Sequence, residues 1–136
     1  MINKILIVLF LISSKSILCQ ETLTVEVKGI NMETKGYLRV GIFKKEGYLD
    51  NTKVINGKIV DINSSTMELN FKLPEGKYAV VIVQDEDKNG ELNKNFIGYP
   101  TEPYAFSNNV KGTIGPASFE DASFYLKESK KITINF

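Results

Sequence analysis

The chain has 136 residues, 43% of them hydrophobic and 24% charged, which is enough for one domain. Its 17 basic and 16 acidic residues nearly balance, so no overall field favours nucleic acid or an anionic membrane surface. The sequence has no histidine and one cysteine, which excludes Ser-His-Asp and Cys-His catalysis, histidine-held zinc or haem, and an internal disulfide.

The N-terminal segment has the pattern of a secretory signal peptide. Lys4 precedes an apolar run over residues 5–12, which is too short to cross a bilayer, because a spanning helix needs about 20 apolar residues. Cleavage after Cys19 predicts a product of residues 20–136, exported to the periplasm or the extracellular space and without a transmembrane segment. Two alternatives are a lipobox in which Cys19 is lipidated, and a buried N-terminal strand or helix.

Residues 20–136 have the alternation of hydrophobic and polar side chains that is typical of half-buried strands. Residues 77–84 (KYAVVIVQ) form the most apolar stretch outside the N-terminal segment, and they predict a central strand covered on both faces. The seven predicted strands are residues 23–27, 36–44, 54–62, 67–73, 77–84, 119–126 and 131–136. Their spacing of about ten residues predicts an all-β fold, a seven-stranded antiparallel β-sandwich of the prealbumin or immunoglobulin type.

Residues 85–118 interrupt this spacing. They show no clear strand pattern, and a loop of this length inside a compact domain is usually functional, ordered by something, or mis-assigned. We therefore expect one long ordered loop in a single domain, and we look there for a functional site.

The loop begins with a pattern typical of calcium-binding loops. Asp85, Asp87 and Asn89 precede Gly90 in the order D-x-D-x-N-G, and the Glu91 carbonyl is the natural next ligand of Ca²⁺. The pattern is not an EF-hand, because its twelfth position is Phe96 and no helix is predicted on either side. A distant carboxylate must then complete the site; the candidates are Glu102, Glu120 and Asp121. The alternative is a polar turn built on Asn89-Gly90.

The next part of the loop is rich in aromatic residues. Phe96, Tyr99, Tyr104 and Phe106 fall within eleven residues. One interpretation is a ligand-binding surface, for example for sugar stacking; the other is a satellite core that fixes the loop to the sandwich. Asn108 and Asn109 could cap local backbone or bind a ligand.

Four blocks of this sequence resemble the DUF2141 family of exported bacterial proteins, whose function is unassigned. They are the D-x-D-x-N-G-x-L block from Asp85, residues 98–102 (GYPTE), residues 106–109 (FSNN) and residues 119–122 (FEDA). The family often has His where this chain has Gln84, and Gly where it has Ala105. The phrase L-P-x-G-x-Y over residues 73–78 is also similar to one in transthyretin-like and carboxypeptidase-regulatory-like sandwiches, which implies a tyrosine packed at a corner.

These observations leave three functions open. The first is an exported, non-catalytic β-sandwich that binds a protein or glycan partner and has a Ca²⁺-ordered loop. The second is a carrier of a small ligand or glycan, with a groove formed by Tyr99, Tyr104 and Phe106. The third is a glycoside hydrolase using Glu102, Glu120 and Asp121. The small size and the absence of tryptophan argue against the third, so we expect no enzymatic activity.

Overall fold

The computed structural model describes residues 19–136, in eight strands and four short helical segments. The predicted signal peptide, residues 1–19, lies outside the described residues except for Cys19. The strands are β1 (Gln20–Lys28), β2 (Tyr37–Phe43), β3 (Asn56–Asp61), β4 (Thr66–Pro74), β5 (Gly76–Asp85), β6 (Tyr104–Phe106), β7 (Phe124–Leu126) and β8 (Lys130–Asn135). The helical segments are η1 (Lys45–Gly47), η2 (Asn51–Lys53), η3 (Ser107–Asn109) and α1 (Phe119–Ala122).

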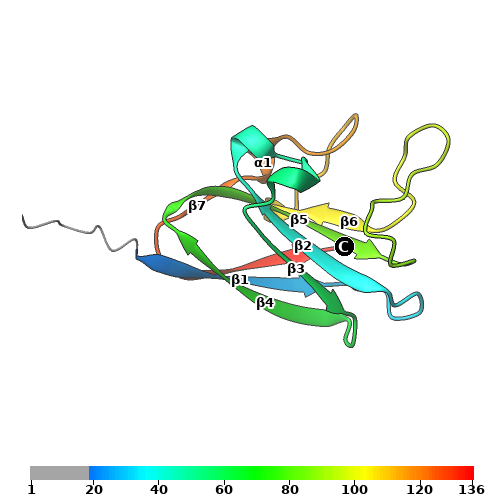
Figure 1. Ribbon diagram of the computed structural model, residues 1–136, viewed down its shortest axis with the longest axis horizontal. Helices are drawn as coiled ribbons and strands as arrows, with labels where there is room; N and C mark the ends of the chain where they lie inside the picture. Colours follow the sequence, from blue (N-terminus) through cyan, green and yellow to red (C-terminus); the bar gives the residue numbers. More distant parts are fainter. Residues whose placement is uncertain (1–18) are drawn as a thin grey trace, which may run out of the picture.

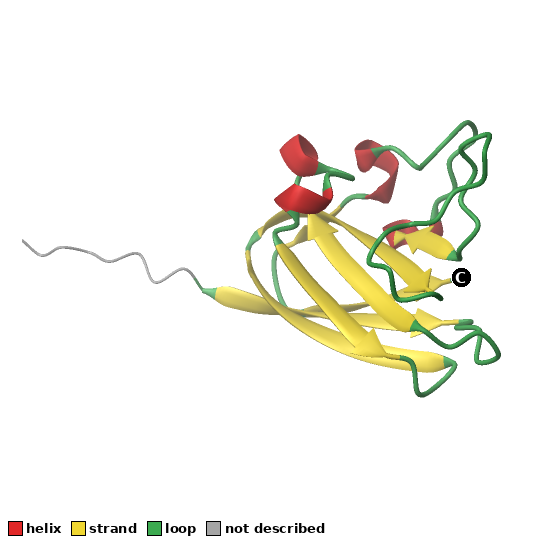
Figure 2. Cartoon of the chain, turned by 45° about the vertical axis from the view of Figure 1, so that its right-hand side comes forward, coloured by secondary structure: helices red, strands yellow, loops and turns green. Residues whose placement is uncertain are grey.

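The strands form two sheets that pack face to face (Figure 1). One sheet has three strands in the order β4-β1-β8. The other has five strands, in the order β3-β2-β5-β6 with β7 paired to the start of β5. Figure 2 shows the short helices at the periphery of these sheets. The predicted all-β sandwich is therefore confirmed.

One strand pair differs from the antiparallel prediction, because β8 runs parallel to β1. The chain reaches β8 from β7, and the turn between them lies beside the start of β1, where the Ser129 hydroxyl accepts a 2.8 Å hydrogen bond from the Thr22 N–H. Since β8 starts at the same end as β1, the two strands point the same way. The strand count also differs from seven, because β6 lies inside the predicted loop.

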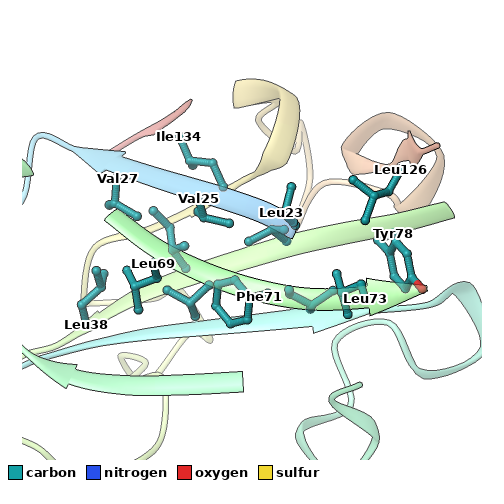
Figure 3. Packing of buried hydrophobic residues seen from close by; sticks show 14 of the residues in the cluster. Leu23, Val25, Val27, Leu38, Leu69, Phe71, Leu73, Tyr78, Leu126 and Ile134 are labelled. Carbon is teal, nitrogen blue, oxygen red and sulfur yellow. The ribbon is translucent and has the colours of Figure 1, made fainter. Parts of the chain in front are cut away.

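The core lies between the sheets and is built from the alternate residues that the sequence pattern marks as apolar (Figure 3). Burial of each valine, leucine or isoleucine side chain contributes roughly 1.5–3 kcal/mol. The core residues labelled in Figure 3 are Leu23, Val25, Val27, Leu38, Leu69, Phe71, Leu73, Tyr78, Leu126 and Ile134. Tyr78 also fixes the corner between β4 and β5, since its hydroxyl donates a 2.9 Å hydrogen bond to the Pro74 carbonyl.

The predicted strand over residues 119–126 is instead helix α1 followed by β7. The Ser118 hydroxyl caps the helix by accepting a hydrogen bond from the Asp121 N–H. Phe119 and Ala122 are three residues apart and are both buried in a second apolar cluster on the outer side of β5. The segment is helical because a helical turn buries both of these side chains, although the sequence also alternates as a strand would.

No helix within residues 19–136 is long and apolar enough to cross a membrane.

Candidate metal centre

The first acidic residue of the predicted metal loop is placed by strand β5. Asp85 is the last residue of β5, pairs in register with Tyr37 and is completely buried. The loop between β1 and β2 lies against its backbone at Gly36, where a Cβ atom would come within 2.2 Å of the Asp85 carbonyl oxygen. Gly36 also has φ +85°, so its lack of a side chain is required both for conformation and for space.

Three carboxylate groups converge at this end of β5. Asp85, Asp87 and Glu102 each place an oxygen within 4.8 Å of the other two. Asp85 is fully buried and Glu102 is 6% exposed, while Asp87 faces solvent. Within residues 19–136 none of the three forms an ion pair with a lysine or arginine. Like charges held this close repel one another unless a cation compensates them.

Backbone N–H groups hold the two buried carboxylates in position. Asp85 accepts hydrogen bonds from the N–H groups of Asn89 (3.1 Å) and Gly90 (2.9 Å). Glu102 accepts them from the N–H groups of Glu86 (2.8 Å) and Asn93 (3.0 Å). An ionised carboxylate offers about four acceptor positions, so each group retains lone pairs for a cation.

Asp87 is held in its ionised form by Asn93. The Asn93 side-chain amide donates a 2.7 Å hydrogen bond to Asp87 Oδ2, and this bond is the main reason that the pKa of Asp87 lies below its ordinary value. The Asn89 N–H adds a second bond, at 3.1 Å, to Oδ1. Asn93 therefore contacts two carboxylates of the cluster, Asp87 through its side chain and Glu102 through its backbone.

The other predicted ligands of this loop lie differently. The side-chain carbonyl of Asn89 accepts a 2.8 Å bond from the Glu91 N–H, while its amide donates to Asp87. Asn89 therefore shapes the turn, and its side-chain oxygen already accepts one hydrogen bond. The side chain of Glu91 is exposed. Glu86 turns toward the β1–β2 loop, where it accepts a 2.8 Å bond from the Thr34 hydroxyl.

Of the distant carboxylates, only Glu102 joins the cluster. Asp121 and Glu120 lie on α1, which packs beside the first half of β5, where Ser107 links Ala122 to Val80. Val80 is five residues before Asp85, or roughly 16 Å along a strand. The Asp121 carboxylate instead accepts a 2.8 Å bond from the Ser118 hydroxyl, and Glu120 pairs with Lys45 at 2.6 Å. The structure therefore does not bring Glu102 together with either α1 acid as a hydrolase pair.

The aromatic residues of the loop divide into a buried and an exposed group. Phe106 is 3% exposed and packs in the second apolar cluster with Phe119, and Tyr104 contacts it edge to face at 5.7 Å between ring centroids. Phe96 and Tyr99 are 99% and 67% exposed. Phe106 thus has the packing role that was one of the two interpretations, while Tyr99 remains available to a ligand.

A hairpin-like turn presents the exposed aromatic residues. The Asn95 side-chain oxygen accepts hydrogen bonds from the N–H groups of Ile97 (3.1 Å) and Tyr99 (3.0 Å), and the Asn95 N–H donates to the Tyr99 carbonyl. Sequence reasoning missed both Asn93 and Asn95. For Asn95, the tendency of asparagine to bond backbone N–H groups two or more residues along is the signal that could have indicated its role. The contact of Asn93 with Asp87 joins two side chains and has no such local signal.

The block Phe106-Ser107-Asn108-Asn109 joins three parts of the fold. In the gap between β6 and β7, the Ser107 hydroxyl accepts a 2.9 Å bond from the Val80 N–H and contacts the Ala122 carbonyl. The Asn108 amide donates to the carbonyls of Asp121 and Ser123, and Asn109 bonds to Thr133 and Asn135 of β8. The polar side chains of both asparagines thus bond backbone, which matches the capping interpretation.

Gln84 directly precedes Asp85 in the sequence, but its role is structural. Because side chains alternate along a strand, Gln84 points to the opposite face of the sheet from Asp85. It is fully buried, and its amide bonds the backbone of Asn31 and Lys35 and the hydroxyl of Thr34. Gln84 fixes the β1–β2 loop and is separate from the carboxylate cluster.

The fold and the cluster together define a small β-sandwich with an acidic loop at the end of its central strand. Residues 25–135 match the model of a family described as uncharacterized protein conserved in bacteria (DUF2141), and the chain belongs to this family. No curated protein and no solved structure matches the chain.

Proposed function

We propose that the protein is an exported, non-catalytic β-sandwich module in which Asp85, Asp87 and Glu102 bind Ca²⁺. The convergence of three carboxylates within 4.8 Å, two of them buried and unpaired with any base in residues 19–136, carries this proposal. The bound ion fixes residues 86–103. This segment presents the turn over residues 95–99, here called the aromatic turn, which carries the exposed Phe96 and Tyr99. Export rests on the signal-peptide pattern of the N-terminal sequence.

The donor set favours Ca²⁺ over other cations. All the available ligands are oxygens, which suit hard cations, and the sequence has no histidine to favour zinc or copper. Calcium accepts six to eight oxygens at irregular angles, whereas Mg²⁺ demands a near-ideal octahedron. Backbone carbonyls and water complete the coordination of Ca²⁺ around the three carboxylates.

The energetic gain is modest and matches a structural role. A cation present at ten times its dissociation constant stabilises the folded chain by about 1.4 kcal/mol. Fixing the backbone of a single loop residue costs roughly 1–2 kcal/mol. The ion therefore offsets part of the cost of ordering residues 86–103, beyond what the asparagine hydrogen bonds supply.

Calcium titration tests the proposal. We expect calorimetry to detect one site, and added Ca²⁺ to raise the melting temperature relative to protein in chelator. Asp87→Asn should abolish both effects with little loss of stability in chelator, because Asp87 is exposed. Asp121→Asn is the matched control and should bind Ca²⁺ normally. Equal melting of the unmodified protein in Ca²⁺ and in chelator, with no heat of binding, would refute the proposal.

A second candidate function is glycan or small-ligand binding by the aromatic turn. The observation that favours it is the exposure of Phe96 and Tyr99 on a segment that Asn95 holds in one conformation. Aromatic faces stack on sugar rings at low entropic cost when they are already ordered. Binding to a glycan array that is lost in Tyr99→Ser and kept in Tyr125→Ser, a half-exposed tyrosine of β7, would support this function.

We also propose that the sandwich is related to transthyretin-like and carboxypeptidase-regulatory-like domains. The hydrogen bond from Tyr78 to Pro74 supports this relationship, since it forms the tyrosine-fixed corner that the L-P-x-G-x-Y phrase implies. An experimental structure whose strand connections match those folds would test it.

A further inference from the structure

The outward faces of the two sheets differ in chemistry. The three-stranded sheet presents polar side chains joined by hydrogen bonds and ion pairs, among them Thr24, Glu26, Asn70, Lys131 and Thr133. The five-stranded sheet instead presents Ile59 of its edge strand β3, which is 61% exposed, and Val81 and Val83 of β5, which are partly exposed. A sheet face in contact with water usually alternates to polar residues, so this apolar surface is suited to being covered.

A pair of glycines hollows this surface. Gly41 of β2 lies in register with Gly57 of β3 on one side and with Val81 of β5 on the other. A Cβ atom at Gly41 would lie 2.9 Å from the Phe43 ring, and one at Gly57 would lie 3.2 Å from Val54. The Phe43 ring and the Val54 side chain therefore occupy part of the space that the two glycines leave, and they border the cavity. The resulting open cavity has a volume of about 310 Å³, which is within the range of small-molecule sites.

Two basic residues line the cavity, Arg39 and Lys58. The Lys58 ammonium lies over the Phe71 ring, 5.2 Å from its centroid, which leaves Arg39 as the charge for a ligand on the outer face. Arg39 is the only arginine of the chain, and it lies between Ile59 and Val83 in the next row of the sheet. Within residues 19–136 its guanidinium forms no ion pair, and its buried Nε atom has no hydrogen-bond partner. Two acids are equally near in register, since Asp61 and Asp85 both pair with Tyr37, two residues before Arg39. Asp61 pairs with Lys88, and Asp85 accepts hydrogen bonds from the N–H groups of Asn89 and Gly90.

This combination specifies the chemistry of a ligand. A guanidinium binds a carboxylate through two parallel N–H···O bonds, and it is the side chain best suited to that geometry. The two glycines and the valine and isoleucine side chains offer an apolar surface next to this charge.

We propose that the outer face of the five-stranded sheet binds a small amphiphilic carboxylate. Its carboxylate pairs with Arg39, and its apolar body lies over Gly41 and Gly57 against Val81 and Ile59. The site is on the face of the sheet and shares no residue with the carboxylate cluster of Asp85, Asp87 and Glu102. Its test is separate from that of Ca²⁺ binding, because the two sites are probed with different ligands and different variants.

Nuclear magnetic resonance titration with octanoate tests the proposal, with octanol as the uncharged probe of equal chain length. We expect octanoate at millimolar concentration to shift the amide signals of Gly41, Gly57, Ile59 and Val81. Octanol should bind about tenfold more weakly, because it lacks the charge-assisted bonds to Arg39. Arg39→Met should weaken octanoate binding by about the same factor while leaving octanol unchanged.

Two further variants keep the test decisive. Lys72→Met removes one positive charge from the other sheet and should leave octanoate binding unchanged. Arg39→Lys keeps the charge without the planar fork and should bind octanoate with intermediate affinity. Absence of shifts at these amides, equal affinity for octanoate and octanol, or equal loss in Lys72→Met and Arg39→Met would overturn the proposal.

Discussion

Asn93 donates its backbone N–H to Glu102 at 3.0 Å, nine residues further along the chain. Its side-chain amide donates at the same time to Asp87 at 2.7 Å. A single asparagine therefore connects an exposed acid that follows β5 with a buried acid that precedes β6. This contact closes the base of the aromatic turn and sets the spacing of the carboxylate cluster.

Replacement of Asn93 by alanine should raise the pKa of Asp87. The Asn93 amide is the main cause of the lowered pKa, and removal of that donor leaves the ionised carboxylate less stabilised. Carboxyl-carbon NMR across an acid titration measures this change. Asn95→Ala is the control, since Asn95 contacts the turn and not Asp87, and it should leave the Asp87 titration in place. An unchanged Asp87 pKa in Asn93→Ala would contradict the assigned contact.

The ion network on the three-stranded sheet predicts an acid-sensitive contribution to stability. The Thr133 hydroxyl, followed by Lys131 and Lys28, lowers the pKa of Glu26 to about 2. Because the folded state favours the ionised carboxylate, this contribution is present above the ordinary pKa of 4.5 and is lost as pH falls toward 2. Glu26→Gln should therefore unfold more easily than the unmodified protein at neutral pH and lose less stability between pH 4.5 and 2.

Urea unfolding at a series of pH values checks this prediction for Glu26. The matched control is Glu75→Gln, because Glu75 is exposed and forms no ion pair among residues 19–136. Its unfolding curve should retain the acid-dependent loss. Parallel pH profiles for Glu26→Gln and the unmodified protein would show that Glu26 makes no such contribution.

Replacement of Ser107 should lower stability by more than the small size of its side chain suggests. Its buried hydroxyl takes the place of a strand partner for Val80, in the gap where β5 is paired by neither β6 nor β7. Ser107→Ala leaves the Val80 N–H and the Ala122 carbonyl without this partner, which should lower the free energy of unfolding by about 1–3 kcal/mol. Chemical denaturation measures the loss, and Ser65→Ala, an exposed serine, should change stability very little.

The comparison of sequence and structure shows which features local patterns encode. Leu23, Val25 and Val27 alternate because one face of β1 is buried, and this pattern was sufficient to predict the strand. The helix at Phe119 was not predicted, because four residues are too few to show a helical period. The cap at Ser118 can be recognised only once the structure shows that Phe119 and Ala122 are buried together. Pattern alone identified the D-x-D-x-N-G segment as the start of a cluster.

The partner carboxylate of that segment is a matter of tertiary structure. Glu102 and Asp121 were equal candidates by composition, and only the path of the chain shows that Glu102 returns beside β5 while Asp121 packs with α1. Arg39 was likewise unremarkable in the sequence. The structure alone shows that it forms no ion pair within residues 19–136 and that it lies next to the glycines of two neighbouring strands.

The last test concerns Gln84. Its replacement shows whether this residue supports the β1–β2 loop or belongs to the acidic site. Gln84→Leu keeps the volume but removes every hydrogen bond to the β1–β2 loop, so the Asn31 N–H and two loop carbonyls lose their buried partner. We expect a loss of about 1–3 kcal/mol in the free energy of unfolding, together with faster hydrogen exchange at Asn31. Gln20→Leu, at the exposed start of β1, is the control and should affect neither quantity. Gln84 faces away from Asp85, so the folded variant should retain the Ca²⁺ affinity of the unmodified protein. A loss of Ca²⁺ affinity with normal stability would place Gln84 in the metal centre instead.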